Sequence, residues 1–223
     1  MSGGRLTARA FHDAGGVEDW RVLYWGAHAF FETGSFTDGA RLVAAISDLA
    51  DELGHFPDVD LRPEGVTVRT FSKEDGSLSD SDIELARQVS EAARRLGLRA
   101  DPSRVQMVGI AVAQDSDVDV RPFWAAAFGY RDLGEEDAID PNRRNPHLWF
   151  HEVEPPRPGR GRVHIDVSVP ADQAEARVAA ALGAGGRIAD DSHVPEWWVL
   201  ASPDNHGVDI AAWPDFEDFD QNG

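Results

Sequence analysis

The first half of the chain contains two stretches in which apolar residues recur at the spacing of an amphipathic helix. The first stretch runs from Leu42 to Leu53 and follows Thr37 and Asp38, whose side chains can cap the start of a helix. Gly54 comes next, and glycine commonly ends a helix because it adopts the left-handed conformation without strain. The pattern therefore predicts a helix that ends at Gly54.

The second helical stretch opens at Ser79, whose hydroxyl can cap it. Asp82, three residues on, favours the first turn of such a helix. Apolar residues then recur from Ile83 to Leu96, and Gly97 ends the pattern. We expect a second helix between Ser79 and Gly97.

Strand-like segments lie before and between these helices. Residues 66–71 alternate as in a half-buried strand, and residues 20–24 and 28–32 resemble a pair of strands. With a short helix before them, the order is helix, two strands, helix, strand, helix. This order predicts an α+β domain in which helices cover one face of an antiparallel sheet.

The second half of the chain carries a weak internal repeat of one strand, one helix and further short strands. In chain order, the strands and helices of the two copies lie at or around residues 105–112, 123–128, 148–153, 163–169, 172–182, 197–201 and 208–212. Repetition at this scale predicts two βαβββ modules that bury one face against each other.

Glycine and proline mark the boundaries between these parts. The segment from Gly97 to Ser103 closes a helical pattern, and the segment from Pro155 to Gly161 is too stiff for a helix or a central strand. We expect a first domain over residues 1–100, a second over residues 104–213, and an acidic tail over residues 214–223.

Charge and cysteine content narrow the partners and the chemistry. The chain has 21 Lys+Arg against 40 Asp+Glu, a formal net charge of −19, which disfavours nucleic acid and membrane surfaces as partners. It has no cysteine, which excludes a thiol nucleophile, a disulfide and cysteine-ligated zinc. Because no apolar run suits a signal peptide or a membrane span, we expect a cytoplasmic protein.

Segments of the first half match a known signature. They are Phe36-Thr37-Asp38, Gly54-His55-Phe56-Pro57-Asp58-Val59 and Gly76-Ser77-Leu78-Ser79-Asp80-Ser81-Asp82-Ile83. With these segments, residues 5–97 resemble the pterin-4a-carbinolamine dehydratases. The resemblance implies a lyase that needs no cofactor, acts on a small ring substrate and self-associates as a homo-oligomer. It implies catalytic positions at His55 and Lys73, and substrate-binding positions at Phe56, Pro57, Asp58, Ser72 and Glu74.

The sequence departs from that family where its chemistry is expected. The family has an adjacent histidine pair and a third histidine further on; here only His55 is a histidine, with Phe56 and Lys73 at the other two positions. Dehydrating a 4a-hydroxytetrahydropterin requires an acid for the departing hydroxyl and a base near the ring N–H. His55 can do one of these jobs, or it is a cation at a helix C-terminus. Phe56 is either a stacking wall for a flat ring or a core residue.

Lys73 is the only lysine in the chain. At a turn beside Glu74, its ammonium is either an ordinary solvated charge or a functional group. A functional lysine could donate a proton, bind an anionic group or form an imine once desolvation lowers its pKa. Both interpretations stay open.

The second half resembles the glyoxalase/bleomycin-resistance superfamily over residues 104–213. The segments that carry the resemblance are Met107-Val108-Gly109-Ile110-Ala111-Val112, Phe123-Trp124, Phe128-Gly129-Tyr130, Leu148-Trp149-Phe150-His151-Glu152-Val153, Arg162-Val163-His164-Ile165-Asp166-Val167 and Ser202-Pro203-Asp204-Asn205. The resemblance implies a sheet cup that takes a small molecule. We expect its pocket to include Met107, Trp149, His151, His164 and Asp209, with Trp197 or Trp198 in the wall.

Metal-using members of that superfamily place four ligands in the cup. The matching positions here are Met107, Trp149, His164 and Asp209, so half of the ligand set is missing. One imidazole and one carboxylate alone hold a divalent ion weakly, because catalytic sites usually supply about three protein ligands. His151 or Glu152 could complete the set, but we expect no tightly bound metal.

Three functions are compatible with the sequence. The first is a pterin-4a-carbinolamine dehydratase or a close derivative. The second is an enzyme of the same fold that acts on another cyclic or heteroaromatic metabolite, with Lys73 in place of a histidine acid. The third is a protein that binds a flat, drug-like molecule in the glyoxalase-like cup and confers resistance to it. Function has to be argued from the site and not from the fold.

Overall fold

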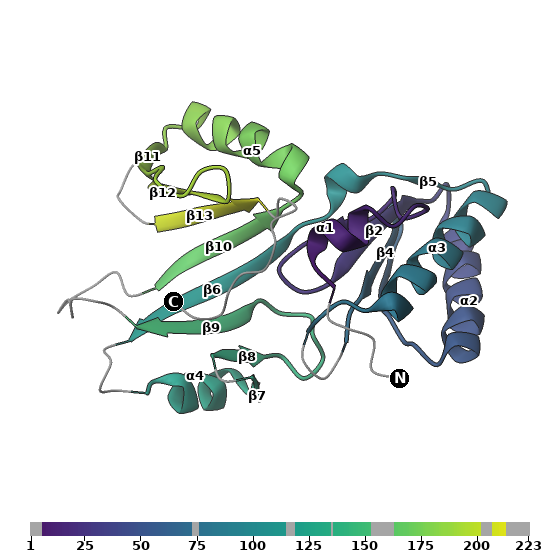
Figure 1. Ribbon diagram of the computed structural model, residues 1–223, viewed down its shortest axis with the longest axis horizontal. Helices are drawn as coiled ribbons and strands as arrows, with labels where there is room; N and C mark the ends of the chain where they lie inside the picture. The colour runs from purple at the N-terminus through teal and green to yellow at the C-terminus, as the bar shows by residue number, and fades with distance from the viewer. Residues whose placement is uncertain are drawn as a thin grey trace. The chain divides into compact units, whose positions relative to one another are not determined.

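The computed structural model describes residues 6–72, 76–114, 119–134, 136–152, 163–201 and 207–212. The chain divides into two compact units, one reaching to Val105 and the other comprising Gln106–Ala212 (Figure 1). Each unit has its own sheet and its own hydrophobic core. In the described ranges, no helix combines the length and apolar character needed to cross a membrane.

The first unit is an antiparallel sheet with helices packed on one face. Its elements are α1 (Ala8–His12), β1 (Arg21–Val22), β2 (Ala27–Glu32), α2 (Phe36–Leu53), β3 (Asp58–Arg62), β4 (Gly65–Thr70), α3 (Asp80–Arg95), β5 (Arg99–Ala100) and the 3-10 turn η1 (Pro102–Arg104). The strands pair in the order β1-β2-β4-β3, and β5 also pairs with β2. The predicted α+β class is confirmed, and the structure adds the short strands β3 and β5.

Local sequence sets the ends of the two long helices. Ser35 caps α2 by accepting a hydrogen bond from the backbone N–H of Asp38 at 3.1 Å. The cap predicted at Thr37 and Asp38 therefore lies two residues too late, and these residues form the first turn. Gly54 ends α2 in the left-handed conformation, with φ 63°, as predicted.

The core of the first unit lies between the sheet and the helices. Alternate residues of β2 and β4 point into it, and apolar residues of α2 and α3 cover them. Its largest fully buried members are Trp20, Phe11, Phe31, Leu42, Leu85, Val66, Val68 and Val89. The Trp20 indole N–H donates to the Ala86 carbonyl and the Ser90 hydroxyl, both at 3.1 Å. This pairing removes the cost of burying the polar end of the indole.

The second unit consists of two βαβββ modules that share one sheet. The first module is β6 (Met107–Gln114), α4 (Arg121–Phe128), β7 (Arg131–Leu133), β8 (Asp137–Ile139) and β9 (His147–Glu152). The second is β10 (Val163–Val169), α5 (Ala171–Gly183), β11 (Arg187–Asp190), β12 (Trp197–Ala201) and β13 (Gly207–Ala212). The predicted pair of modules is confirmed.

The two modules meet where β6 and β10 pair antiparallel at the centre of the sheet, in the strand order β11-β12-β13-β10-β6-β9-β8-β7. Within each module, the first and last strands pair parallel. Residues such as Val169 pack with α5, and residues such as Val112 pack with α4, on the same face of the sheet. The opposite face carries His164, and we call it the His164 face.

Candidate functional site

His55 lies where three elements of the first unit converge. It follows Gly54 directly at the end of α2, and its backbone N–H donates to the Ala50 carbonyl at 3.1 Å. Thr70 is the last residue of β4, and Asp82 lies in the first turn of α3. Both Thr70 and Asp82 are completely buried, whereas the His55 side chain is 20% exposed.

Both carboxylate oxygens of Asp82 form hydrogen bonds. One carboxylate oxygen, Oδ1, contacts His55 Nε2 at 2.8 Å and accepts the Thr70 hydroxyl at 2.6 Å. The other oxygen, Oδ2, accepts the backbone N–H and the hydroxyl of Ser79, both at 2.8 Å. Asp82 thus completes the capping box of α3 with one oxygen and holds His55 with the other.

The electrostatic balance favours the ionised form of Asp82. Burial alone would raise its pKa, but the hydrogen bonds from His55, Thr70 and Ser79 outweigh burial and lower the pKa. Its place in the first turn of α3 adds the favourable end of the helix dipole. A buried carboxylate is therefore kept charged by four short contacts.

This carboxylate selects one tautomer of the His55 ring. Because an ionised carboxylate only accepts hydrogen bonds, His55 Nε2 carries the proton that faces Asp82. Nε2 also lies 3.0 Å from the Thr70 hydroxyl oxygen. Nδ1 is then the basic atom of a neutral ring, and it has no hydrogen-bond partner within the described part of the chain. The geometry can take up or deliver a proton at Nδ1.

The other predicted residues of this site differ in exposure and in their contacts. Phe56 is 53% exposed, so the structure excludes its alternative as a core residue. Pro57 is half-buried, and Asp58 forms an ion pair with Arg69 at 2.7 Å. The Ser72 backbone N–H donates to the Ser77 carbonyl and the Ser72 carbonyl accepts from the Gly76 N–H, both at 2.8 Å. Lys73 and Glu74 lie outside the described residues.

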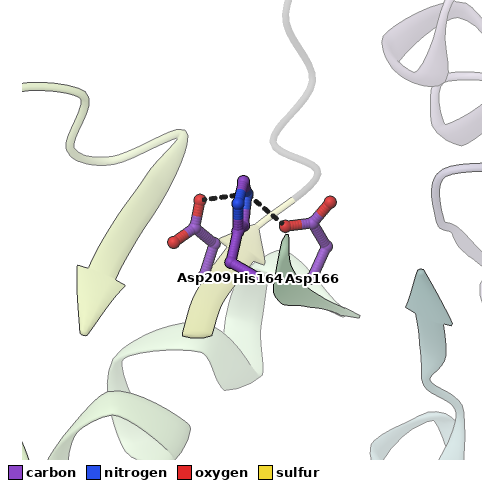
Figure 2. Close-up of side chains that lie close together, drawn as sticks. All are labelled: His164, Asp166 and Asp209. Atoms are coloured by element: carbon purple, nitrogen blue, oxygen red, sulfur yellow. Dashed lines mark ion pairs between the residues drawn. The ribbon is translucent and has the colours of Figure 1, made fainter. Parts of the chain in front are cut away.

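A second cluster of polar side chains lies on the His164 face of the second unit. His164 Nε2 is 3.2 Å from Asp166 Oδ1 and 3.4 Å from Asp209 Oδ2, with the imidazole between the two carboxylates (Figure 2). His164 and Asp166 are two residues apart on β10, and Asp209 pairs with Asp166 from the neighbouring β13. Strand alternation therefore places all three side chains on one face.

The cluster is crowded with negative charge. The pKa of Asp209 is raised to about 6, chiefly by burial, with the Asp166 charge adding to the shift and His164 opposing it. The Asp166 carboxylate beside it raises the pKa of His164, against the effect of burial. Unlike Asp82, Asp209 has no hydrogen-bond donor other than His164 in the described part of the chain.

Aromatic residues of β9 extend this cluster. Trp149 donates its indole N–H to Asp166 Oδ2 and stacks on His151 with a centroid distance of 4.7 Å. The strand register pairs Trp149 with Ala111 and Ala111 with His164, so the indole reaches Asp166 across a small residue. The alternation also puts His151 and not Glu152 on the His164 face.

Two further predicted wall residues can be assigned from the register. Met107 pairs with Ser168 and lies on the His164 face. Trp197 pairs with Ala211 on the same face and stacks on His193 at 4.1 Å, whereas Trp198 is buried in the core beside α5. Of the two tryptophans, Trp197 is therefore the one that lies on the His164 face.

The residues of this cluster suit a divalent metal ion. The three ligand atoms of His164, Asp166 and Asp209 lie within 4.8 Å of one another. Two ligand atoms that each lie about 2.0–2.2 Å from one ion are about 2.9–3.5 Å apart, and the separations of 3.2 and 3.4 Å match that spacing. The donor set fits, although the sequence expectation was that too few ligands are present.

Sequence reasoning missed two residues of these clusters. Asp82 was recognised only as a helix-start residue, because its contact with His55 joins positions 27 apart in sequence. Asp166 was noticed only as part of a family segment. Its signal was present, since a residue two positions from His164 on a strand shares its face.

Two family models match the chain in the order expected from the resemblances. Residues 5–92 match the model described as pterin 4 alpha carbinolamine dehydratase, and residues 109–211 match the model described as a glyoxalase-like domain. Both resemblances are therefore confirmed: a dehydratase-like domain is followed by a glyoxalase-like domain.

Similar proteins are found for the first of these domains. A protein of Nocardia farcinica named "Putative pterin-4-alpha-carbinolamine dehydratase" is 40% identical over 60 residues, which are 27% of this chain and 63% of the relative. A Halobacterium salinarum protein of the same name is 38% identical over 56 residues, 25% of this chain and 62% of the relative. The chain thus spans less than two thirds of these relatives. The crystal structure of a transcriptional coactivator/pterin dehydratase from Brucella melitensis covers 40% of this chain and 99% of its own, at 20% identity and a TM-score of 0.38.

Proposed function

We propose that the first unit is a lyase of the pterin-4a-carbinolamine dehydratase type with an altered site. The observation that carries the proposal is the His55 ring, which Asp82 holds through Nε2 while Nδ1 is left for proton transfer. The dehydratase domain model and the similarity to the named dehydratases support the reaction class. The substrate is a small cyclic or heteroaromatic carbinolamine.

The proposed reaction removes water from the ring. The C–O bond to the hydroxyl breaks, the adjacent ring N–H gives up its proton, and a C=N double bond forms. The hydroxyl leaves as water, so no oxidant or cofactor is required. One group takes the N–H proton and one supplies a proton to the hydroxyl. We assign one of these transfers to His55 Nδ1 and the other to Lys73, which stands at the position of a family histidine.

Phe56 supports a flat substrate at this site. Its ring is 53% exposed although it directly follows His55, and an exposed aromatic ring beside a proton-transfer group can stack against a heteroaromatic substrate. We propose that it fills the place of the second family histidine by providing a binding surface instead of a second imidazole.

The test is a dehydration assay with 4a-hydroxytetrahydropterin. Wild type should accelerate loss of water, and His55→Gln should lower turnover by about 10²- to 10⁴-fold, the usual contribution of a general acid or base. Lys73→Arg should be as impaired as Lys73→Ala, because a guanidinium keeps the charge but does not release a proton near neutrality. Asp60→Asn is the matched control, since Asp60 is 52% exposed and forms an ion pair with the exposed Arg62.

Two results would contradict parts of this proposal. Full activity of His55→Gln would place the chemistry away from His55. A wild-type protein that fails to dehydrate the pterin but binds other ring compounds through His55 would identify an altered substrate within the same site. We also propose that the protein is cytoplasmic and self-associates as a homo-oligomer. Light scattering on the purified chain would test the self-association.

A second candidate function concerns the His164 face. Trp149 and Trp197 lie on that face together with the imidazole and carboxylates of the cluster, an arrangement of aromatic walls with a few converging polar groups. We propose small-molecule binding or resistance as the alternative role of the whole protein. Thermal-shift measurements with flat aromatic compounds, repeated on Trp197→Ala, would test it.

A further inference from the structure

Two carboxylates of the second unit converge on a single ring nitrogen. Asp166 and Asp209 both approach His164 Nε2, at 3.2 and 3.4 Å (Figure 2). Both contacts are longer than the 2.7–2.9 Å of a charge-assisted N–H···O bond, and one N–H cannot point well at two oxygens. A single proton on Nε2 is therefore a poor partner for this pair of carboxylates.

We propose that His164, Asp166 and Asp209 bind one divalent transition-metal ion through Nε2 and one oxygen of each carboxylate. The ion replaces the proton as the group on which all three side chains converge. The site lies in the second unit and does not depend on the proposed dehydratase function.

This ligand set differs from the four-ligand cup that the superfamily resemblance implies. All three ligands come from the second module, on the adjacent strands β10 and β13. The positions in the first module are Met107 and Trp149, and an indole cannot bind a metal through its N–H. Asp166 supplies the third ligand that these positions lack.

Trp149 contributes to this site by orienting a ligand. Its N–H donates to Asp166 Oδ2, which leaves Oδ1 as the oxygen that faces His164. The ring lies in register with Ala111, whose methyl group leaves room for the indole to reach β10. Hydrogen bonds of this kind fix ligand orientation, and their loss typically lowers metal affinity about 10- to 100-fold.

Two buried polar atoms belong to residues on the same face of the sheet. Within the described part of the chain, neither His151 Nε2 nor Ser168 Oγ has a hydrogen-bond partner. Ser168 is only 5% exposed and lies two residues beyond Asp166, and the His151 ring centroid is 6.0 Å from that of His164. Buried polar groups are nearly always hydrogen-bonded. Of these two groups, the His151 ring, which stacks on Trp149, is the one shown to lie beside the cluster, where a water on an open position of the ion would bind.

The donor set defines the class of ion. One imidazole nitrogen and two carboxylate oxygens suit Mn²⁺, Fe²⁺, Co²⁺, Ni²⁺ or Zn²⁺, whereas ions that require thiolate ligands are excluded because the chain has no cysteine. Three protein ligands are the number found in catalytic sites that keep a position open for water or substrate.

The experiment measures metal binding by the full-length protein. The chain is stripped with a chelator, dialysed and titrated by calorimetry with MnCl₂, NiCl₂ or ZnCl₂ alone. The variants are Asp166→Asn, Trp149→Phe and, as matched control, Asp132→Asn, which removes a carboxylate that is 63% exposed on β7 of the same unit. Wild type and Asp132→Asn should bind one equivalent of at least one of these ions with equal affinity.

The variants separate this ligand set from unspecific binding. Trp149→Phe should raise the Kd about 10- to 100-fold, and Asp166→Asn should raise it at least as much. Circular dichroism checks that each variant is folded. No binding by wild type would overturn the proposal. Stoichiometric binding that Asp166→Asn leaves unchanged would also overturn it, because the ion would then be held by other ligands.

Discussion

The two units each place a histidine against aspartate carboxylates, but the two carboxylate environments differ. In the first unit, His55 faces one completely buried aspartate, Asp82, whose oxygens accept four short hydrogen bonds. In the second unit, His164 lies between Asp166 and Asp209 at longer distances. The hydrogen bonds lower the pKa of Asp82 against burial, whereas burial raises the pKa of Asp209 to about 6.

The difference shows that a His–Asp pair alone does not define a function. A carboxylate saturated with donors stays charged and fixes one tautomer of its histidine, which suits proton transfer by the other ring nitrogen. Two poorly saturated carboxylates on one nitrogen carry more negative charge than a proton balances, which suits a cation.

The largest effect is expected when the saturated carboxylate is changed. In Asp82→Asn, one oxygen becomes an NH₂ group and can no longer accept hydrogen bonds, so His55, Thr70 and Ser79 cannot all be satisfied. We expect kcat for dehydration to fall about 10²-fold through misorientation of His55. The free energy of unfolding should fall by about 1–3 kcal/mol.

The assay has to separate positioning from folding. Turnover is measured below the unfolding temperature of each variant, and the pH profile of kcat is recorded, because a changed tautomer of His55 shifts that profile while a purely structural defect does not. Asp60→Asn should match wild type in both measurements. An unchanged pH profile and kcat in folded Asp82→Asn would remove Asp82 from the proposed mechanism.

A second buried histidine makes the first unit sensitive to acid. Burial and the nearby Arg69 lower the pKa of His28 from 6.5 to about 3, and its Nε2 contacts the Trp25 carbonyl at 3.1 Å. The unfolded chain binds a proton below pH 6.5 while the folded chain stays neutral to about pH 3. The contribution of neutral His28 to the free energy of unfolding is therefore fully present above pH 6.5 and is lost as the pH falls through this window.

The expected loss is about 2 kcal/mol between pH 6.5 and pH 5, at 1.36 kcal/mol for each pH unit. His28→Gln should flatten this dependence, even though its stability at neutral pH is lower. Hydrogen exchange of the β2 and β4 amides, corrected for intrinsic rates, reports on the first unit alone. Equal slopes for wild type and variant would show that His28 is protonated in the folded chain.

The sequence predicted those elements whose ends depend on interactions between residues close together in the chain. The α2 and α3 helices were predicted because their ends depend on nearby residues, such as Gly54 and the Ser79–Asp82 pair. The strands β3 and β11 were not located, since β3 (Asp58–Arg62) is mostly charged and β11 (Arg187–Asp190) is exposed along its length. β11 lacks the apolar alternation that marks a strand, whereas in β3 Val59 and Leu61 alternate with charged residues, so that strand could have been predicted.

The sites show the same limit. His55, His164 and Asp209 were found from the sequence, but Asp82 and Asp166, which also contact these histidines, were not. Asp82 reaches His55 through tertiary packing, and Trp149 reaches Asp166 across β6, so neither contact has a local signal. Asp166 alone could have been found, by applying strand alternation to His164.

A smaller effect is expected from removing a carboxylate of the second cluster. The folded pKa of Asp209, about 6, exceeds its ordinary value of 3.8. Stability therefore falls as the pH rises through this window, and at pH 7 the charged side chain is held at a cost relative to the unfolded chain. In metal-free protein, Asp209→Asn should raise the free energy of unfolding by about 1–2 kcal/mol.

The same substitution should have the opposite effect when metal is present. An ion that binds only the folded chain stabilises wild type in proportion to the logarithm of its concentration over Kd, and Asp209→Asn loses most of that gain. Melting curves with chelator and with added ZnCl₂ measure both signs. A variant less stable than wild type in chelator would show that the folded chain does not hold the charged Asp209 side chain at a cost.

The smallest effect concerns the exposed ring next to His55. Phe56 and Phe36 are matched, since both lie in the first unit and are 53% and 55% exposed. Because neither ring is buried, truncating either to alanine should change the free energy of unfolding by less than about 0.5 kcal/mol.

If Phe56 stacks on a flat substrate, Phe56→Ala should raise KM about 2- to 10-fold, the equivalent of a stacking contact of about 0.5–1.5 kcal/mol. Phe36→Ala should leave KM unchanged, because α2 places Phe36 and His55 at opposite ends of the helix. Equal KM values for the two variants would mean that Phe56 is exposed for a reason other than substrate binding, and would confine the proposed site to proton transfer at His55.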